Sequence, residues 1–367
     1  MRVRKVLLVM LRALGINPSG QAFNQQNAQN NLTTSTILNL SEALISEAKT
    51  KFSVGPEFLQ SILSGLLPGK NLSEIKSLHQ LTSSFPEQKK SISYALATNN
   101  RGKQLVERVT HLSGITRGRY LDIGSAYSGS VLAFKNAGFD ALGIEIVPYF
   151  YAHGQKNLKD HGKTNLLING DFLEYNFSNE QFDVITCSDV IEHVNDPIYA
   201  LKKGAALVPD GGLFHLYIPN KDCLRNVEKD IHYHIFGMNL LPHHMARYLN
   251  RLIMFPEYSI GEFFELNFYT RILTEAGMTV SVTDKDPVPF EQAGEAMASL
   301  EKAQEAWRED QAQQIDHFLR EEIEKRLAIY WTDIRQAFQT ASTPLQQEAF
   351  VTKYLTSVWE ICARKHP

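Results

Sequence analysis

The sequence is poor in cysteine, in long apolar runs and in excess charge of either sign. Its three cysteines, Cys187, Cys223 and Cys362, lie far apart and match neither a metal site nor a disulfide framework. This scarcity favours a reduced, cytoplasmic setting. No stretch approaches the roughly 20 apolar residues of a transmembrane helix. The net charge of −3 leaves no basic excess, so bulk binding to nucleic acid or to an anionic membrane is not expected.

The N-terminus resembles a secretory signal at first sight, because basic residues precede a short apolar run. Arg12 interrupts that run after Leu11, however, and no small-residue cleavage site follows. We therefore expect a short amphipathic helix that docks on the domain or on a membrane surface. Residues 16–36 are rich in Asn, Gln, Ser and Thr, so segment 1–36 is predicted to be flexible.

What the sequence does have is a βαβ pattern between residues 119 and 146. An apolar run ends at Gly124, a turn of small residues and a helical pattern follow, and a second apolar run ends at Glu145. Small residues let a ligand approach the backbone, and helix-start N–H groups lie nearby. An acid roughly 20 residues beyond the turn can accept both hydroxyls of a ribose. The pattern therefore predicts a nucleoside-binding unit.

Further apolar runs alternate with helical patterns along the chain. They cover residues 166–169, 182–187, 213–218 and 280–282. This alternation predicts an α/β fold with a Rossmann-like, doubly wound and mostly parallel sheet. Ligands of such sheets bind beyond the carboxyl ends of the strands. Four polar residues fall at those predicted ends: Asp122, Glu145, Asp171 and Ser188.

Helical patterns flank this core on both sides. We expect a helical N-terminal region over 37–115, a core domain over 116–285 and a helical C-terminal region over 286–367, which contains no glycine after Gly294. The C-terminal helices are expected to pack on the domain, with a homodimerising arm as the alternative. Within the core domain, residues 221–265 are rich in His and aromatic residues and are interpreted as a lid-like insertion.

Several motifs resemble those of the class I S-adenosylmethionine (SAM) methyltransferases. Leu121 to Gly124 match the start of L-D-[IV]-G-x-G-x-G, with Ala126 and Ser128 in place of the later glycines. Residues 189–194, Asp-Val-Ile-Glu-His-Val, resemble the D-x-x-E-H-V segment of the ubiquinone-biosynthesis O-methyltransferases.

Two later segments extend the resemblance over about residues 118–282. Residues 207–212 are similar to the L-x-P-G-G turn of the same family, and residues 268–278 to its segment ending in A-G-F. The resemblance implies a Rossmann-like fold and SAM as the cofactor. It implies cofactor contacts for Asp122, Gly124, Ser125, Ala126, Gly129, Glu145, Asp171, Phe172 and Ser188.

The resemblance also implies which of these residues contacts which part of the cofactor. The turn would hold the methionine moiety, near which Ser188 would lie, Glu145 would bind the ribose, and Asp171 with Phe172 would read the adenine. Each has a simpler alternative. Glu145 can be a surface acid, Asp171 can form a turn after Gly170, and Phe172 can belong to the core.

His193 is the candidate general base, because methyl transfer to oxygen benefits from a group that takes the hydroxyl proton. Its alternative role is to cap or orient the helix expected from residue 190. A metal is a further alternative: Asp189, Glu192 and His193 can face one ion, as in relatives with an E-x-x-E-H segment. The insertion offers a second set of metal donors, namely His232, His234, His243 and His244.

The sequence thus predicts a cytoplasmic SAM-dependent methyltransferase. The acceptor is expected to be an oxygen of a small molecule or of a glycan-like precursor, although the fold also supports nitrogen and carbon acceptors. Two alternatives remain. One is a nicotinamide-dependent oxidoreductase, against which the missing middle glycine counts. The other is a non-catalytic interaction protein that keeps a degenerate SAM pocket.

Overall fold

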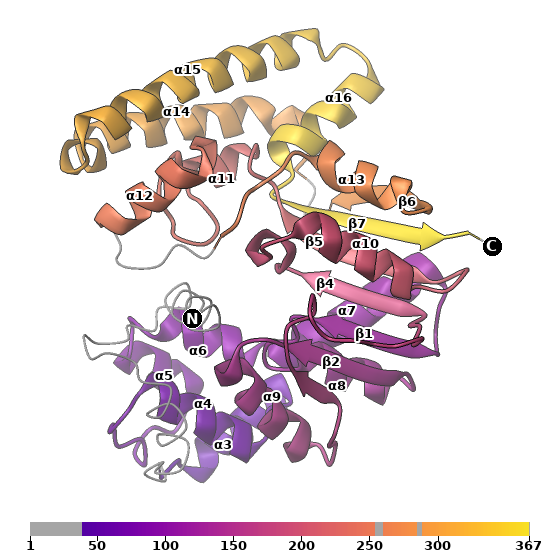
Figure 1. Cartoon of the computed structure of the whole chain (residues 1–367). Helices are drawn as coiled ribbons and strands as arrows, with labels where there is room; N and C mark the ends of the chain where they lie inside the picture. The colour runs from indigo at the N-terminus through magenta and orange to yellow at the C-terminus, as the bar shows by residue number, and fades with distance from the viewer. Residues whose placement is uncertain (1–38, 254–259, 285–287, 367) are drawn as a thin grey trace. The chain divides into compact units, whose positions relative to one another are not determined.

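The computed structural model describes residues 39–253, 260–284 and 288–366 of the chain (Figure 1). The predicted flexible segment 1–36 lies outside the described residues. The chain divides into two compact units, Met1–Thr186 and Cys187–Pro367. None of the described helices combines the length and the apolar character needed to cross a membrane.

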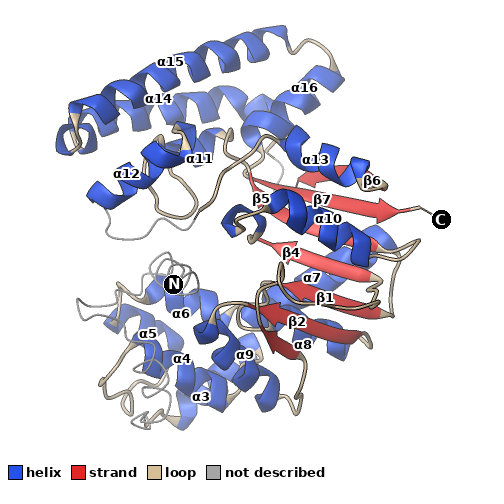
Figure 2. Cartoon of the chain, in the orientation of Figure 1, coloured by secondary structure: helices blue, strands red, loops and turns tan. Residues whose placement is uncertain are grey.

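The strands form one seven-stranded sheet in the order β3-β2-β1-β4-β5-β7-β6 (Figure 2). The first five follow the Rossmann order, in which neighbouring parallel strands are joined by helices. β1, β2 and β3 pair in parallel, whereas β7 pairs antiparallel with both β5 and β6. The predicted α/β, doubly wound, mostly parallel fold is confirmed. The strand bounds are β1 Arg119–Ile123, β2 Asp140–Glu145, β3 Leu167–Asn169, β4 Val184–Ser188, β5 Leu213–Pro219, β6 Met278–Asp284 and β7 Val358–Lys365.

The first unit begins with the helical region that the periodicity predicts. Its helices are α3 Glu42–Phe52, α4 Pro56–Leu66, α5 Leu78–Ser84, α6 Lys89–Leu96, α7 Thr98–Ser113, α8 Gly129–Asn136 and α9 Pro148–Asp160. The carboxylate of Asp160 accepts the N–H groups of Glu57 and Phe58, so it caps the start of α4 from a residue far along the chain. The N-terminal helices are therefore tied to α9.

The apolar core of these helices continues into the turn after β1. The ring of Tyr127 is buried and makes edge contacts with Phe58 of α4 and Phe150 of α9, at centroid distances of 5.5 and 5.0 Å. The Asn157 side chain donates to the carbonyl of Tyr127 and exchanges hydrogen bonds with Asn99. The helical region thus holds the glycine turn from one side.

Helices α7 and α8 approach each other backbone to backbone at a pair of glycines. A Cβ added at Gly129 would overlap the carbonyl oxygen of Thr98, and one added at Gly102 would overlap the carbonyl oxygen of Gly129. The space at Gly129 is therefore already filled by α7. This packing role was not predicted from the sequence, because nothing in the local pattern pairs residue 102 with residue 129.

The second unit carries the remaining helices and strands. Its helical elements are η1 Ile191–His193, α10 Pro197–Leu207, α11 Leu224–Glu228, η2 Met238–Leu240, α12 His243–Ile253, α13 Leu266–Glu275, η3 Phe290–Gln292, α14 Ala293–Glu309, η4 Gln311–Gln314, α15 His317–Thr340, α16 Pro344–Phe350 and η5 Val351–Leu355. Helices α14 and α15 run side by side (Figure 1), joined by a hydrogen bond from Trp331 to Gln304 and an ion pair between Arg308 and Glu324.

Two helix predictions in this unit are wrong in part. The helix expected from residue 190 is a short 3-10 turn, because Pro197 starts a new helix that the Asp196 side chain caps. The C-terminal region expected to be helical ends in strand β7, which lies between β5 and β6. Its continuous buried run from Trp359 to Ala363 suits a central strand.

The centre of these three strands holds one buried acid. Glu360 of β7 is fully buried, and its carboxylate lies 2.9 Å from the Nε2 atom of His215 on β5. It also accepts hydrogen bonds from the hydroxyls of Tyr217 and Thr283, at 3.0 and 2.6 Å. Three partners from two neighbouring strands satisfy this acid, as burial of a charge requires.

Gly129→Ala is expected to destabilise the protein by about 3 kcal/mol, because the new methyl group forces α7 away from α8. The free energy of unfolding in urea measures this. The matched control is Gly294→Ala in α14, where a Cβ meets nothing within 4 Å. The control should be neutral or gain about 0.5–1 kcal/mol. Equal stability of the two variants would contradict the glycine contact.

Candidate active site

The turn after β1 keeps the backbone of a glycine-rich loop although two of its positions are not glycine. Gly124, Ala126 and Ser128 all have left-handed backbones, with φ angles of 75°, 44° and 60°. Such angles are costly for residues with a Cβ. Hydrogen bonds hold the turn in this shape, from the N–H of Gly124 to Ile144 and from that of Ser128 to Ser125. The three sites are those where the methyltransferase motif has glycine.

Glu145 at the end of β2 is the acid that organises this turn. One carboxylate oxygen accepts the N–H of Ala126 and the other accepts the N–H of Val147, both at 2.7 Å. The side chain is 3% exposed, and this burial raises the pKa of its carboxyl to about 7, although the two backbone bonds oppose the rise. Each oxygen keeps a further lone pair for a ribose hydroxyl, so the residue fits the predicted cofactor.

Asp122 lies one strand away and is also buried. It accepts a hydrogen bond of 2.7 Å from the Thr186 hydroxyl, which lies 2.6 Å from the hydroxyl of Tyr120. Burial raises the pKa of Asp122 to about 6, and its hydrogen bonds with Thr186 and Tyr120 oppose the rise. The nearby charge of Asp122 also contributes to the raised pKa of Glu145. Thr186 lies inside an apolar strand pattern, so no local signal distinguishes it in the sequence.

The next predicted acid joins them on the same edge of the sheet. Glu145 pairs with Asn169 across β2 and β3, and the N–H of Gly170 donates to the carbonyl of Glu145. Asp171 follows directly, and its carboxylate accepts the N–H of Leu173. This hydrogen bond forms the turn after Gly170 that was the simpler alternative for Asp171. Phe172 is 8% exposed and packs near Phe177. Both simpler roles are therefore present, and the adenine contacts stay predictions.

Two serines complete the predicted set. Ser125 is buried, and its hydroxyl donates to the carbonyl of Asp122, so it braces the turn. A Cβ at Gly143 would overlap that hydroxyl, which explains the small residue in β2. Ser188 ends β4, and its hydroxyl has no hydrogen-bond partner among the residues the structure describes.

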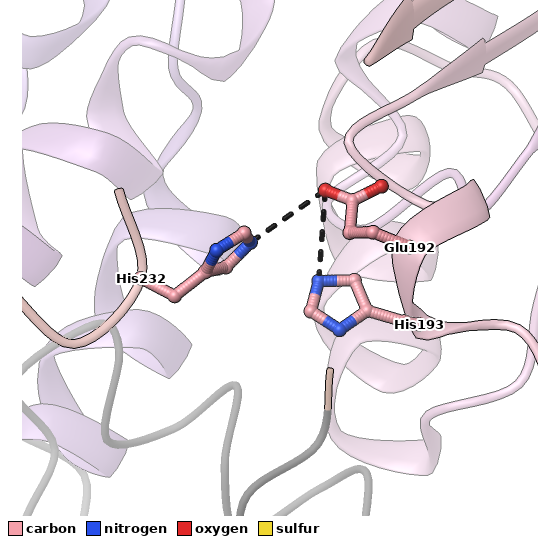
Figure 3. Close-up of side chains that lie close together, drawn as sticks. All are labelled: Glu192, His193 and His232. Atoms are coloured by element: carbon pink, nitrogen blue, oxygen red, sulfur yellow. Dashed lines mark ion pairs between the residues drawn. The ribbon is translucent and has the colours of Figure 1, made fainter. Parts of the chain in front are cut away.

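A second group of polar side chains gathers in the other unit, around Glu192 (Figure 3). The Nε2 atoms of His193 and His232 lie 3.9 and 3.5 Å from the same oxygen of Glu192. The two imidazole rings meet edge to face at a centroid distance of 5.1 Å. Within the described parts of the chain, this is the one group of three or more His, Cys, Asp or Glu residues with metal-ligand spacing.

The structure therefore regroups the two metal-donor sets considered from the sequence. Glu192 and His193 come from one set and His232 from the other. Asp189 does not belong to the group around Glu192. Its backbone is left-handed, with φ 54°, and its N–H donates to the carbonyl of Tyr217. No local pattern links residue 193 to residue 232, so only the fold reveals this pair.

Glu192 differs from the other buried acids in its lack of donors. The residue is 1% exposed, and neither carboxylate oxygen has a hydrogen-bond partner among the described residues. Burial raises the pKa of the carboxyl, and the neighbouring His193 opposes that rise. The segment is held in place by its backbone, because the carbonyl of Glu192 accepts the N–H of Gly261 at 2.7 Å.

The family of the chain follows from a comparison of its sequence with known proteins. A family model described as "Methyltransferase domain" matches residues 90–281, which is more than half of the chain. The chain belongs to this methyltransferase family. The matched region contains the glycine turn, Glu145 and the whole group around Glu192. The resemblance drawn from the motifs is thereby confirmed, together with SAM as the cofactor of the family.

Curated relatives agree with this assignment over part of their length. The chain is 33% identical over 119 residues to the ubiquinone biosynthesis O-methyltransferase of Bordetella avium, covering 29% of this chain and 45% of the relative. It is 32% identical over 110 residues to that of Actinobacillus pleuropneumoniae, covering 28% and 46%. The chain thus spans about half the length of the curated relatives it matches.

Two solved structures match the chain at low identity. The YcgJ protein of Bacillus subtilis matches with a TM-score of 0.41 and 14% identity, covering 72% of this chain and 99% of that one. The BH2331 protein of Bacillus halodurans matches with a TM-score of 0.40 and 13% identity, covering 71% and 99%.

Ala126→Gly is expected to raise the free energy of unfolding by about 0.5–1 kcal/mol, because glycine adopts the left-handed backbone without a steric cost. Urea unfolding measures the change. Ala133→Gly, in the right-handed interior of α8, is the control and should lower stability by about 1 kcal/mol. A loss of stability in Ala126→Gly would show that the turn is not strained.

The stability of the protein is expected to fall as the pH rises from 5 to 7.5. The folded state keeps a proton on Glu145 up to about pH 7, whereas the unfolded chain loses it near 4.5. Linkage then lowers the free energy of unfolding by about 2 kcal/mol over this window. Glu145→Gln should remove that part of the slope, and the exposed Glu174→Gln should keep it. Urea titrations at both pH values test this, and an unchanged slope in Glu145→Gln refutes it.

Proposed function

We propose that the chain is an enzyme that transfers a methyl group from SAM to an oxygen of a small molecule or of a glycan-like precursor. The observation that carries the proposal is the left-handed turn hydrogen-bonded to Glu145. This turn lies within a domain of the methyltransferase family. The curated relatives are named as O-methyltransferases, which favours oxygen as the acceptor atom. Family membership argues against the nicotinamide-dependent alternative.

The residues of the first unit would bind and orient the cofactor. Its sulfonium already activates the methyl group, so the protein's task is alignment and exclusion of water. Glu145 would accept the ribose hydroxyls with its remaining lone pairs, and the turn from Gly124 to Gly129 would hold the methionine part. A rigid turn loses little freedom when the cofactor binds.

His193 would take the proton of the acceptor hydroxyl. Its side chain is 10% exposed, and its Nε2 atom lies 3.9 Å from the Glu192 carboxylate. That carboxylate stabilises the imidazolium formed when His193 accepts a proton, as a carboxylate does for a catalytic histidine in general. The lid role of residues 221–265 and the cytoplasmic location remain part of the same proposal.

Calorimetry should show that the protein binds SAM and S-adenosylhomocysteine and does not bind NADH. Glu145→Ala should lose this binding, because the ribose loses its acceptor and the turn loses its anchor. Glu174→Ala, an exposed acid after β3, is the control. Absence of SAM binding to the unaltered chain would refute the proposed function.

His193→Ala should bind SAM normally and release S-adenosylhomocysteine at least about 100-fold more slowly, since general-base catalysis contributes about that much. The assay follows S-adenosylhomocysteine release in a cell extract that supplies acceptors. His317→Ala is the control, because His317 is a largely exposed histidine of the same unit. If His193→Ala keeps the full rate, the base lies elsewhere.

A further inference from the structure

We propose that Glu192, His193 and His232 bind one divalent first-row transition-metal ion of the Zn²⁺ class. The site goes beyond the proposed methyl transfer, since metal binding is measured without any acceptor or cofactor.

The buried carboxylate of Glu192 needs a positive partner. It is 1% exposed and has no hydrogen-bond donor within the described residues. A buried charge without donors is costly unless it is paired or binds a metal. Two imidazole nitrogens face the same oxygen, at 3.5 and 3.9 Å, which is too far for a hydrogen bond.

These distances leave room for an ion between the side chains. Ligand atoms about 2.0–2.2 Å from a metal ion lie roughly 3–3.5 Å from one another. The three candidate ligand atoms all lie within 4.8 Å of one another, and Figure 3 shows both imidazoles turned toward the carboxylate. Small rotations of the side chains bring them to bonding distance.

The donor set selects the kind of ion. Two imidazoles and one carboxylate suit Zn²⁺ and its first-row neighbours, whereas Mg²⁺ and Ca²⁺ prefer oxygen ligands. Three protein ligands also leave a coordination position open, which is the arrangement of catalytic rather than structural zinc sites.

An outer residue supports His232 from behind. Asp230 is fully buried, and its carboxylate accepts the N–H groups of His232 and Tyr233. One of its oxygens lies 3.9 Å from the Nδ1 atom of His232, which is too far for a hydrogen bond. Asp230 therefore fixes the His232 segment through the backbone N–H groups, and its carboxylate lies near the ring nitrogen that does not face Glu192.

One consequence alone rests on the proposed function. An acceptor hydroxyl bound at the open position would have its pKa lowered by the ion. With the ion bound, the hydroxyl proton would pass to water and His193 would serve as a ligand. The role of His193 as the base, proposed above, is that of the metal-free chain.

The test uses the full chain, freed of metal with a chelator and titrated with Zn²⁺ by calorimetry and with Co²⁺ by visible absorption. We expect one ion per chain. His232→Ala and Glu192→Gln should weaken binding by more than about 100-fold, which exceeds the cost of losing an outer partner. His244→Ala, an exposed histidine of the same insertion, should bind like the unaltered chain. Equal affinity in all four proteins would overturn the site.

Thermal unfolding supplies a second readout that separates a metal ligand from a structural acid. Zn²⁺ should raise the melting temperature of the unaltered chain and leave that of Glu192→Gln unchanged. Without metal, Glu192→Gln should melt higher than the unaltered chain, because it removes an unsatisfied buried charge. A lower melting temperature would show that the imidazoles alone satisfy the carboxylate, and would overturn the proposal. SAM binding, measured separately on the same samples, reports on the proposed function independently.

Discussion

The hydrogen bonds that the Glu145 carboxylate accepts from Ala126, in the turn after β1, and from Val147, after β2, are the interaction on which the first unit depends. They hold Ala126 in a left-handed conformation that alanine otherwise avoids, and they fix the exit of β2 at Val147. The same turn presents Tyr127 to the N-terminal helices, whose core forms around its ring. One buried acid thus connects the strand ends, the turn and the helical region. This explains how the turn keeps the shape of a glycine loop after two glycines are lost.

Two buried acids of the second unit, Glu360 and Glu192, differ in the hydrogen-bond donors around their carboxylates. Glu360 has a histidine and two hydroxyls within hydrogen-bond distance, and it lies among three strands. Glu192 has two histidines beyond that distance and no donor among the described residues. The first arrangement satisfies its carboxylate. The second is satisfied only when something positive joins it, which is why a function is assigned to Glu192 and none to Glu360.

Local patterns were enough to predict the parallel strands, the turn and the acids at the ends of β1, β2 and β3. Each of these signals lies within a βαβ unit, so neighbours in the sequence are neighbours in the sheet. Apart from the helix break at Pro197, the missed features are non-local. Gly129 packs on a helix that precedes β1, and His232 meets His193 across two intervening helices and a strand. Strand β7 follows a helical pattern without a break of glycine, and it is a strand because β5 and β6 leave a place between them.

The position of β7 also explains what the C-terminal helices do. Helices α14 to α16 leave the sheet after β6 and return to it at β7, so they form an insertion rather than an appendage. They pack on the other insertion, that of residues 221–265. Phe236 stacks on Trp307, and Tyr330 and Arg326 donate to the carbonyls of Asp222 and Leu240. The apolar face that the periodicity predicts on α15 is buried within the unit. These helices therefore support the segment that carries His232. Of the two roles considered for them, packing on the domain and a homodimerising arm, the structure provides contacts for the packing.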